Sequence, residues 1–223
     1  MSGLGFAALA VELETFLAGA LSLSAQAPTV LEGELRGGPA TLTTRRYLGP
    51  SIHHARVAIL KAPGIEIGNL VFFPALHLAA PILGIDLVSL PGAAGLVAAD
   101  LSPSGAGAAA LAAADLGIGL PSAGPLPAWA SAIFSSRPLF ARVGPSTAAL
   151  AASAAHGLAE AFVEAVRTSP SDRAREPLAR AALLHYCKLH RQDERTLGVL
   201  TRAFGEARAR RYIENVLFPE VTA

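Results

Sequence analysis

Asp86 is the ionisable residue whose surroundings in the sequence most clearly suggest chemistry. It lies in residues 81–91 (PILGIDLVSLP), where it is the single charged side chain among mostly apolar ones. If this segment is a strand, alternation puts Ile82, Gly84 and Val88 on the same face as Asp86, and the carboxyl group points into whatever covers that face. Burial raises the pKa of a carboxyl group, which would keep Asp86 protonated near neutral pH as a proton donor. The alternative is a structural aspartate satisfied by backbone N–H groups.

Asn69 is a second isolated polar residue on an apolar segment. Within residues 66–73 it shares one alternating face with Ile67, Val71 and Phe73, and it is the only polar side chain on that face. Two such groups are more than packing requires, and if they face the same side of a sheet they line one pocket. We expect Phe73 to contribute a contact to a substrate in that pocket.

A third group of candidates lies in residues 185–196 (HYCKLHRQDERT). On a continuous helix Tyr186, His190 and Glu194 fall four residues apart and form one polar edge, with Asp193 and Arg195 beside it near the helix end. The same pattern is typical of an ordinary amphipathic helix end, so it does not identify a site by itself.

The histidines and the cysteine do not form a recognisable metal site. None of the six histidines lies four residues from another, and the single cysteine, Cys187, excludes an internal disulfide and a thiolate metal cluster. Residues 105–110 (GAGAAA) match a dinucleotide-binding pattern, but no Asp or Glu between Asp115 and Glu160 supplies the acid that holds the ribose. We therefore predict no metal site and no dinucleotide-binding site.

These candidate residues need elements to hold them, and the pattern predicts strands followed by helices. Runs rich in Val, Ile, Leu and Thr, separated by Gly and Pro, predict six strands, over residues 30–36, 40–48, 52–62, 66–73, 82–90 and 95–101. Helical patterns cover residues 8–23, 107–116, 147–168, 174–190, 196–204 and 206–217.

The short connections between the strands leave no room for crossover helices, so we predict that the strands pair as an antiparallel meander. Strands 66–73 and 82–90 are apolar on both faces, which means that helices cover both sides of the sheet. The predicted fold is a single domain over residues 1–223, a three-layer α/β/α sandwich with a central antiparallel sheet.

The composition excludes several classes of protein. With 52% hydrophobic and 16% charged residues, the chain can form a large core and is not intrinsically disordered. The uncharged run over residues 67–85 contains Asn69, two prolines and a histidine, so it fails as a membrane span. No Lys or Arg precedes Arg36, so there is no basic segment of a signal peptide, and we expect a cytoplasmic protein. Residues 167–223 carry 11 basic and 7 acidic side chains, an excess that could steer an acidic partner.

Several spaced segments resemble the ferredoxin-dependent bilin reductases, which reduce the biliverdin made by haem oxygenase. The central strands of that family are similar to residues 69–74 (NLVFFP), 82–88 (ILGIDLV) and 99–103 (ADLSP). Its middle segment is similar to residues 126–129 (LPAW) and 134–142 (FSSRPLFAR), and its C-terminal signature to residues 185–187 (HYC), 193–196 (DERT), 204–207 (FGEA) and 211–218 (RYIENVLF). The resemblance spans residues 50–218 and implies the same antiparallel sheet between helical layers.

The resemblance implies an oxidoreductase that takes electrons singly from reduced ferredoxin and supplies protons to bilin radicals, with no flavin or metal of its own. In that family the residue that Asp86 matches is the main proton donor. We therefore expect biliverdin as substrate, reduced ferredoxin as external electron donor and haem oxygenase as a candidate partner. We also expect a monomer that binds neither nucleic acid nor membrane.

The position of Asn69 bears on the product. The phycocyanobilin-forming members carry a histidine there, whereas the phycoerythrobilin- and phytochromobilin-forming members carry asparagine. The glutamate that the phycocyanobilin group uses for vinyl reduction is missing, because the corresponding strand reads RVAIL from Arg56. The resemblance thus implies reduction to dihydrobiliverdin or phycoerythrobilin.

The sequence departs from the family pattern at the second acid and at the residues that hold the propionates. The family's second, helix-borne aspartate aligns with Glu194, and its neighbour Asp193 is the adjacent candidate. Arg195 replaces a lysine, His190 replaces a glutamine and Gly95 replaces a serine, and the resemblance implies that these positions bind substrate.

Two other functions are compatible with these departures. The first is a tetrapyrrole-binding protein that keeps the pocket without turnover, and the second is a reductase of another open-chain tetrapyrrole such as a chlorophyll catabolite.

Overall fold

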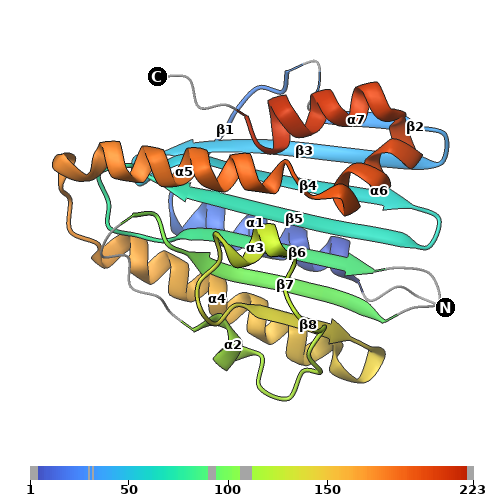
Figure 1. Cartoon of the computed structure of the whole chain (residues 1–223), viewed down its shortest axis with the longest axis horizontal. Coiled ribbons are helices and arrows are strands. Elements are labelled where there is room, and N and C mark those ends of the chain that lie inside the picture. The colour runs from blue at the N-terminus through green and yellow to red at the C-terminus, as the bar shows by residue number, and fades with distance from the viewer. Residues whose placement is uncertain (1–4, 30, 32, 90–93, 106–111, 220–223) are drawn as a thin grey trace.

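The computed structural model describes residues 5–219 apart from residues 30, 32, 90–93 and 106–111 (Figure 1). In the described part of the chain, one antiparallel sheet runs in the order β1-β3-β4-β5-β6-β7-β8, with β2 also paired to β3. Its strands are β1 (Ser24–Ala25), β2 (Gly33–Gly37), β3 (Ala40–Gly49), β4 (Ile52–Ala62), β5 (Ile65–Pro74), β6 (Ile82–Ser89), β7 (Gly95–Ser102) and β8 (Leu139–Val143).

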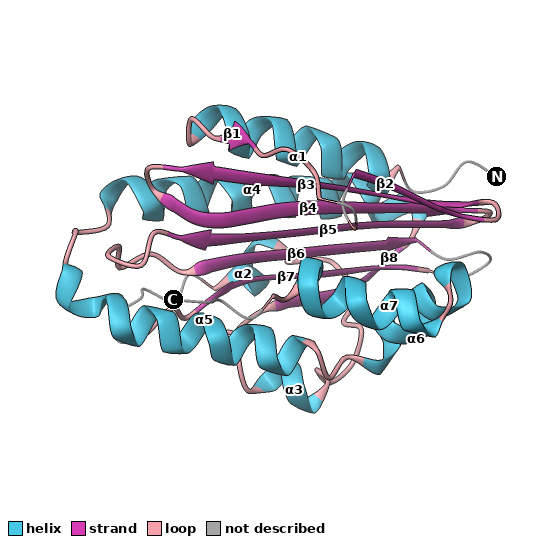
Figure 2. Cartoon of the chain, turned by 90° about the horizontal axis from the view of Figure 1, so that it is seen from above, coloured by secondary structure: helices cyan, strands magenta, loops and turns pink. Residues whose placement is uncertain are grey.

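Helices cover both faces of this sheet. They are α1 (Phe6–Ala20), α2 (Ala113–Leu116), α3 (Ala128–Ser131), α4 (Ala148–Thr168), α5 (Glu176–His190), α6 (Glu194–Phe204) and α7 (Glu206–Tyr212), with a π-helical turn at Ile213–Leu217 and 3-10 turns at Pro145–Thr147 and Arg173–Arg175. Figure 2 shows α1 and α4 on one side of the strands and α3, α5, α6 and α7 on the other. This arrangement confirms the predicted three-layer sandwich with a central antiparallel sheet.

The α1 and α4 layer forms the larger apolar core. Helix α1 lies against β4, β5 and β6, and α4 lies against β6 and β7. The apolar faces of the two helices are buried against the strands, as the 3.6-residue period requires. Gly68 on β5 permits this approach, because a Cβ built there would lie 2.6 Å from the Cβ of Ala10.

One helical segment, Pro145–Thr168, is long and apolar enough by length and composition to cross a membrane. In the structure it packs along the sheet and buries one face, which includes Ala155, Leu158 and Phe162. Burial in the core therefore accounts for its apolar composition.

The sequence prediction missed two strands and misplaced several boundaries. Strands β1 and β8 lie at the ends of the sheet order and have two and five residues, too few for alternation to be read with certainty. The strand predicted over residues 30–36 begins at Gly33. The first half of the helix predicted over residues 107–116 lies outside the described residues, and its last four residues form α2.

We predict that Gly68→Ala destabilises the fold by about 1–3 kcal/mol, because the added methyl group overlaps Ala10 and forces α1 away from the sheet. Gly19→Ala is a matched control: Gly19 is exposed on α1 with open space around it, and there alanine should stabilise the helix by about 0.5–1 kcal/mol. Urea unfolding measures both changes. A Gly68→Ala protein as stable as the wild type would contradict this packing of α1.

Candidate active site

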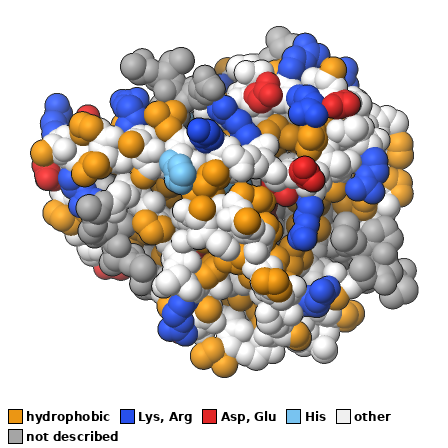
Figure 3. Space-filling model, viewed as in Figure 1, with side chains coloured by type: hydrophobic (Ala, Val, Ile, Leu, Met, Phe, Trp, Pro, Cys, Tyr) orange, Lys and Arg blue, Asp and Glu red, His pale blue; other side chains and the backbone are white. Residues whose placement is uncertain are grey.

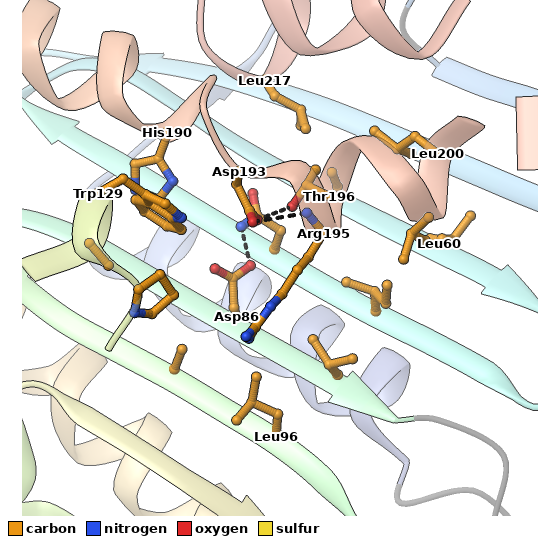
Figure 4. Close-up of a pocket in the computed structure, with 18 of the residues that line it drawn as sticks. Leu60, Asp86, Leu96, Trp129, His190, Asp193, Arg195, Thr196, Leu200 and Leu217 are labelled. Carbon is orange, nitrogen blue, oxygen red and sulfur yellow. Dashed lines mark hydrogen bonds between the residues drawn. The ribbon is translucent and has the colours of Figure 1, made fainter. Parts of the chain in front are cut away.

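A cavity of about 310 Å³ lies between the sheet and the layer of α3, α5, α6 and α7 (Figure 4). Its wall is mostly apolar, with side chains from β3 to β8 and from the covering helices. The polar and charged side chains in the wall are Asn69, Asp86, His190, Asp193, Arg195, Thr196 and Tyr212. The fold therefore gathers five of the residues singled out in the sequence, from two strands and two helices, around one space.

A row of residues across the sheet forms the floor of this cavity. The register pairs Ala58 with Asn69, Asn69 with Asp86, Asp86 with Ala98, and Ala98 with Phe140, and all five residues line the cavity. Cross-strand partners project from the same face, so Asn69 and Asp86 share a face. Because alanines flank the polar pair, a flat ligand lying on the sheet can reach both polar side chains.

Asp86 is held in a state suited to proton exchange. Burial raises its pKa to about 6, while a hydrogen bond donated by the Asn69 amide Nδ2 to Oδ1 and the charge of Arg56 lower the pKa, and the nearby charge of Asp193 raises it. The balance leaves Asp86 protonated in mildly acidic solution and ionised above neutral pH. The carboxyl group can thus give up a proton and take it back near physiological pH.

Arg56 is a functional residue that the sequence reasoning did not single out. Its side chain is fully buried, its Nη1 donates to Oδ1 of Asn69, and its Nε donates to the Leu217 carbonyl oxygen at 2.6 Å. The guanidinium also lies over the Phe218 ring, 4.8 Å from the centroid. Its isolation among apolar neighbours on β4 is a signal in the sequence. Its pairing with Asn69, however, depends on the register of β4 and β5.

The polar edge expected from Tyr186 through His190 to Glu194 requires one continuous helix and is wrong, because α5 ends at His190 and α6 begins at Glu194. Asp193 is the reason for the new helix start. Its carboxylate accepts hydrogen bonds from the backbone N–H of Arg195 at 3.2 Å and from the Thr196 hydroxyl at 2.6 Å, which is an N-cap.

This N-cap geometry changes which acid faces the site. Asp193 lines the cavity opposite Asp86, whereas Glu194 is exposed and does not line it (Figure 4). Glu194 therefore does not occupy the place in the cavity wall that the alignment gave it. Arg195 is exposed to solvent at the cavity rim, and its side chain extends beside Asp86.

Two further candidates lie away from the cavity wall. Phe73 is buried in the neighbouring core, where its ring packs edge-on against Tyr186 with centroids 5.7 Å apart. Gly95 begins β7 and does not line the cavity, although the residues on both sides of it, Ala94 and Leu96, do. The structure therefore gives neither residue a direct contact with a ligand in this space.

His190 closes one end of the cavity within a group of aromatic rings. Its ring stacks on Phe218 at 4.5 Å between centroids and contacts Trp129 at 4.5 Å and Tyr186 at 4.3 Å. Burial holds its pKa well below the usual value, so the ring is neutral. Its Nε2 is buried and has no hydrogen-bond partner among the described residues.

No group of three or more His, Cys, Asp or Glu side chains that could hold a metal ion occurs among the described residues. The fold and the site are those of a three-layer sandwich with a mostly apolar cavity and, at its floor, a carboxyl group whose pKa is raised by burial. The family model of the ferredoxin-dependent bilin reductases matches residues 24–219, and the chain belongs to this family.

Individual relatives agree with this assignment. The chain is 31% identical over 202 residues to a phycocyanobilin:ferredoxin oxidoreductase from Gloeobacter violaceus, covering 84% of this chain and 78% of the relative. It is 32% identical over 200 residues to the enzyme of the same name from Prochlorococcus marinus, with 85% and 75% covered. A crystal structure of phytochromobilin synthase from tomato in complex with biliverdin has the same fold, with a TM-score of 0.78, 19% identity, and coverage of 95% of this chain and 83% of that one.

We predict a pH-dependent effect of Asp86→Asn on stability. The pKa of Asp86 is raised from 3.8 to about 6 in the folded protein, so the folded state binds more protons and loses stability as the pH rises through this range. Asparagine cannot ionise, so the free energy of unfolding of the variant should match that of the wild type at about pH 4. At about pH 8 it should be larger by about 1–3 kcal/mol. Denaturant unfolding at both pH values measures this, and a difference that does not change with pH would contradict the assignment.

Proposed function

We propose that this chain catalyses the ferredoxin-dependent reduction of biliverdin to dihydrobiliverdin, with phycoerythrobilin as the candidate product of a second reduction. The observation that carries the proposal is Asp86, a carboxyl group with a pKa of about 6 at the floor of an apolar cavity, in a member of the bilin reductase family. The structural similarity to a phytochromobilin synthase that holds biliverdin supports biliverdin as the ligand.

Each reduced double bond requires two electrons and two protons. One electron from reduced ferredoxin converts biliverdin to a radical anion, and Asp86 donates a proton to it. A second electron and a second proton complete the step, and two ferredoxins are oxidised. After each donation Asp86 is a carboxylate, which the Asn69 N–H and the Arg56 charge stabilise until a proton returns from solvent.

The asparagine at position 69 supports reduction at the C15–C16 methine bridge, because it matches the phycoerythrobilin- and phytochromobilin-forming type. A histidine at this place can itself exchange a proton, whereas an amide can only donate and accept hydrogen bonds. Asp86 is then the acid at the floor of the site, and the bilin lies between it and α6.

Asp193 is the better candidate for the second acid, because it lines the cavity while Glu194 faces solvent. Its position at the start of α6 places a carboxyl group on the opposite wall from Asp86. Two acids on opposite walls can serve different parts of one tetrapyrrole, which a reduction in two stages requires.

The positive charge on the surface over the cavity is evidence for an acidic protein as the electron donor. Figure 3 shows most Lys and Arg side chains of this face lying over the layer of α5, α6 and α7. Arg173 and Arg195 are exposed there, and Arg191 is half-buried. A ferredoxin docked on this layer would lie against the helices that enclose the bilin, and the attraction between opposite charges would speed its arrival.

Anaerobic mixing with biliverdin and chemically reduced ferredoxin tests the proposal. We expect binding, a blue shift of the bilin absorption and, by chromatography, dihydrobiliverdin or phycoerythrobilin. The rate should fall as salt rises, because charges on the surface are screened over about 10 Å at about 0.1 M salt. Asp86→Asn should bind biliverdin and accumulate the radical.

Other outcomes would replace the proposal. A stable green complex that does not react would indicate a tetrapyrrole-binding protein, and a failure to bind would indicate another substrate. Phycocyanobilin as the main product would overturn the role given to Asn69, and product formation at the wild-type rate in Asp86→Asn would remove Asp86 from the mechanism.

We predict that Asp193→Asn blocks or strongly slows the second two-electron step and leaves the first intact. Asparagine is as good an N-cap as aspartate, so the start of α6 should be retained while the acid is lost. Glu194→Gln is the matched control on the adjacent exposed residue and should give wild-type products. Chromatography of single-turnover mixtures separates the dihydro intermediate from the final product, and a block in Glu194→Gln alone would show that the exposed acid is the donor.

A further inference from the structure

Arg56 is the charged side chain that lies deepest in the described part of the site. It is fully buried on β4, and it is not among the residues that line the cavity. Burial alone lowers the pKa of an arginine, and the ordinary value is so high that the side chain keeps its charge. A permanent cation in a dry interior is costly unless it is compensated, so its partners indicate what it does.

The chemistry of the partners fixes the direction of a chain of hydrogen bonds. A guanidinium group can only donate, so the Asn69 atom that faces Arg56 is the amide oxygen, Oδ1. The other end of the same amide, Nδ2, then faces Asp86 and can only donate to its Oδ1. Asp86 is therefore an acceptor at Oδ1, and its exchangeable proton belongs on Oδ2.

We propose that Arg56 is a positioning residue for proton transfer: it fixes the Asn69 amide, so that Asp86 carries its proton on the oxygen that Asn69 does not occupy, and it stabilises the carboxylate left after donation. The inference rests on the proposed function of the same site. Without a donor at position 56, the amide could rotate and offer its oxygen to protonated Asp86. That bond would hold the proton in the floor of the site instead of releasing it.

The groups around Asp86 decide how its charge responds to the loss of Arg56. The titratable and charged side chains that face it or act on it from the strands and helices packed around the site are Arg56 on β4, Tyr186 and His190 on α5, Asp193 at the N-cap of α6, Arg195 on α6, and Tyr212 on α7. Arg56 and the Asn69 hydrogen bond lower the pKa of Asp86, and Asp193 raises it. Burial and Asp193 both raise the pKa of Asp86. Without Arg56 these effects are less opposed, so the pKa should rise.

Arg191 provides a control for the structural role of Arg56, which is to hold the C-terminal turn. Both arginines use Nε to hold a carbonyl oxygen at the C-terminal turn: Arg56 binds Leu217 at 2.6 Å and Arg191 binds Phe218 at 2.7 Å. Arg56 binds Asn69 and lowers the pKa of Asp86, whereas Arg191 is not among the groups that shift that pKa. A variant of Arg191 therefore loosens the same turn without changing the hydrogen bonds of the acid.

The test is the titration of Asp86 in the ligand-free protein, followed by infrared spectroscopy of aspartate labelled with carbon-13, with the Asp86 band assigned by its absence in Asp86→Asn. We expect Arg56→Met to raise the pKa of Asp86 by about one pH unit or more, an about tenfold change in its ionisation constant. Arg56→Gln, which can still donate to Asn69 but carries no charge, should raise the pKa by less. Arg191→Met should leave it unchanged.

The outcomes separate this inference from the proposed function. An unchanged Asp86 titration in Arg56→Met, or in Arg56→Gln if the methionine variant does not fold, would overturn the role of Arg56. An equal shift in Arg191→Met would also overturn it, because the cause would then be the C-terminal turn. The titration uses no bilin, so a wild-type protein that fails to reduce biliverdin while Asp86 still responds to Arg56 would refute the proposed function alone. With biliverdin and ferredoxin, the maximal rate of Arg56→Met should be lower than that of the wild type, and its decline with rising pH should begin at a higher pH.

Discussion

A carboxyl group in an apolar wall is tolerated only if the fold compensates its charge, and this constraint organises one face of the sheet. Asp86 must be buried enough for its carboxyl group to stay protonated near neutral pH. Its carboxylate form must also be stabilised enough for the proton to leave. Asn69 on the adjacent strand β5 and Arg56 on β4, one strand further, supply that support as one row of hydrogen bonds from β4 through β5 to β6. Asp193 opposes it from the helix above. The acidity of the site is the result of these opposed contributions.

A paired sheet suits this task because each strand is fixed by two neighbours. The register places Asn69 directly opposite Asp86, and the small residues Ala58 and Ala98 at either end of the pair leave space for a ligand. The helices contribute the opposite wall, and their ends provide polar groups. The break between α5 and α6 turns one helix end, at His190, and one helix start, at Asp193, toward the same space.

The sequence predicted those parts of the site that depend on local pattern. Alternation along β5 and β6 singled out Asn69 and Asp86 as isolated polar side chains and left open whether they share a face, which the strand register decides. Apolar strands were enough to predict helices on both sides. The predicted helices 174–190 and 196–204 already left a gap between them, but the capping role of Asp193 was not predicted, because a capping aspartate inside an amphipathic pattern looks the same as a surface residue until its hydrogen bonds are seen. The role of Arg56 depends on which residues of β4 and β5 are opposite each other, and alternation does not specify register.

The most direct test of the account is the pH dependence of bilin radical decay in a single turnover, followed by rapid mixing of the biliverdin complex with a stoichiometric amount of reduced ferredoxin. If protonated Asp86 is the donor, the rate constant of decay should be constant below about pH 6 and fall about tenfold for each pH unit above it. A decay rate that does not vary across this range, measured with the electron transfer complete, would contradict the assignment of Asp86 as the acid on which the site is built.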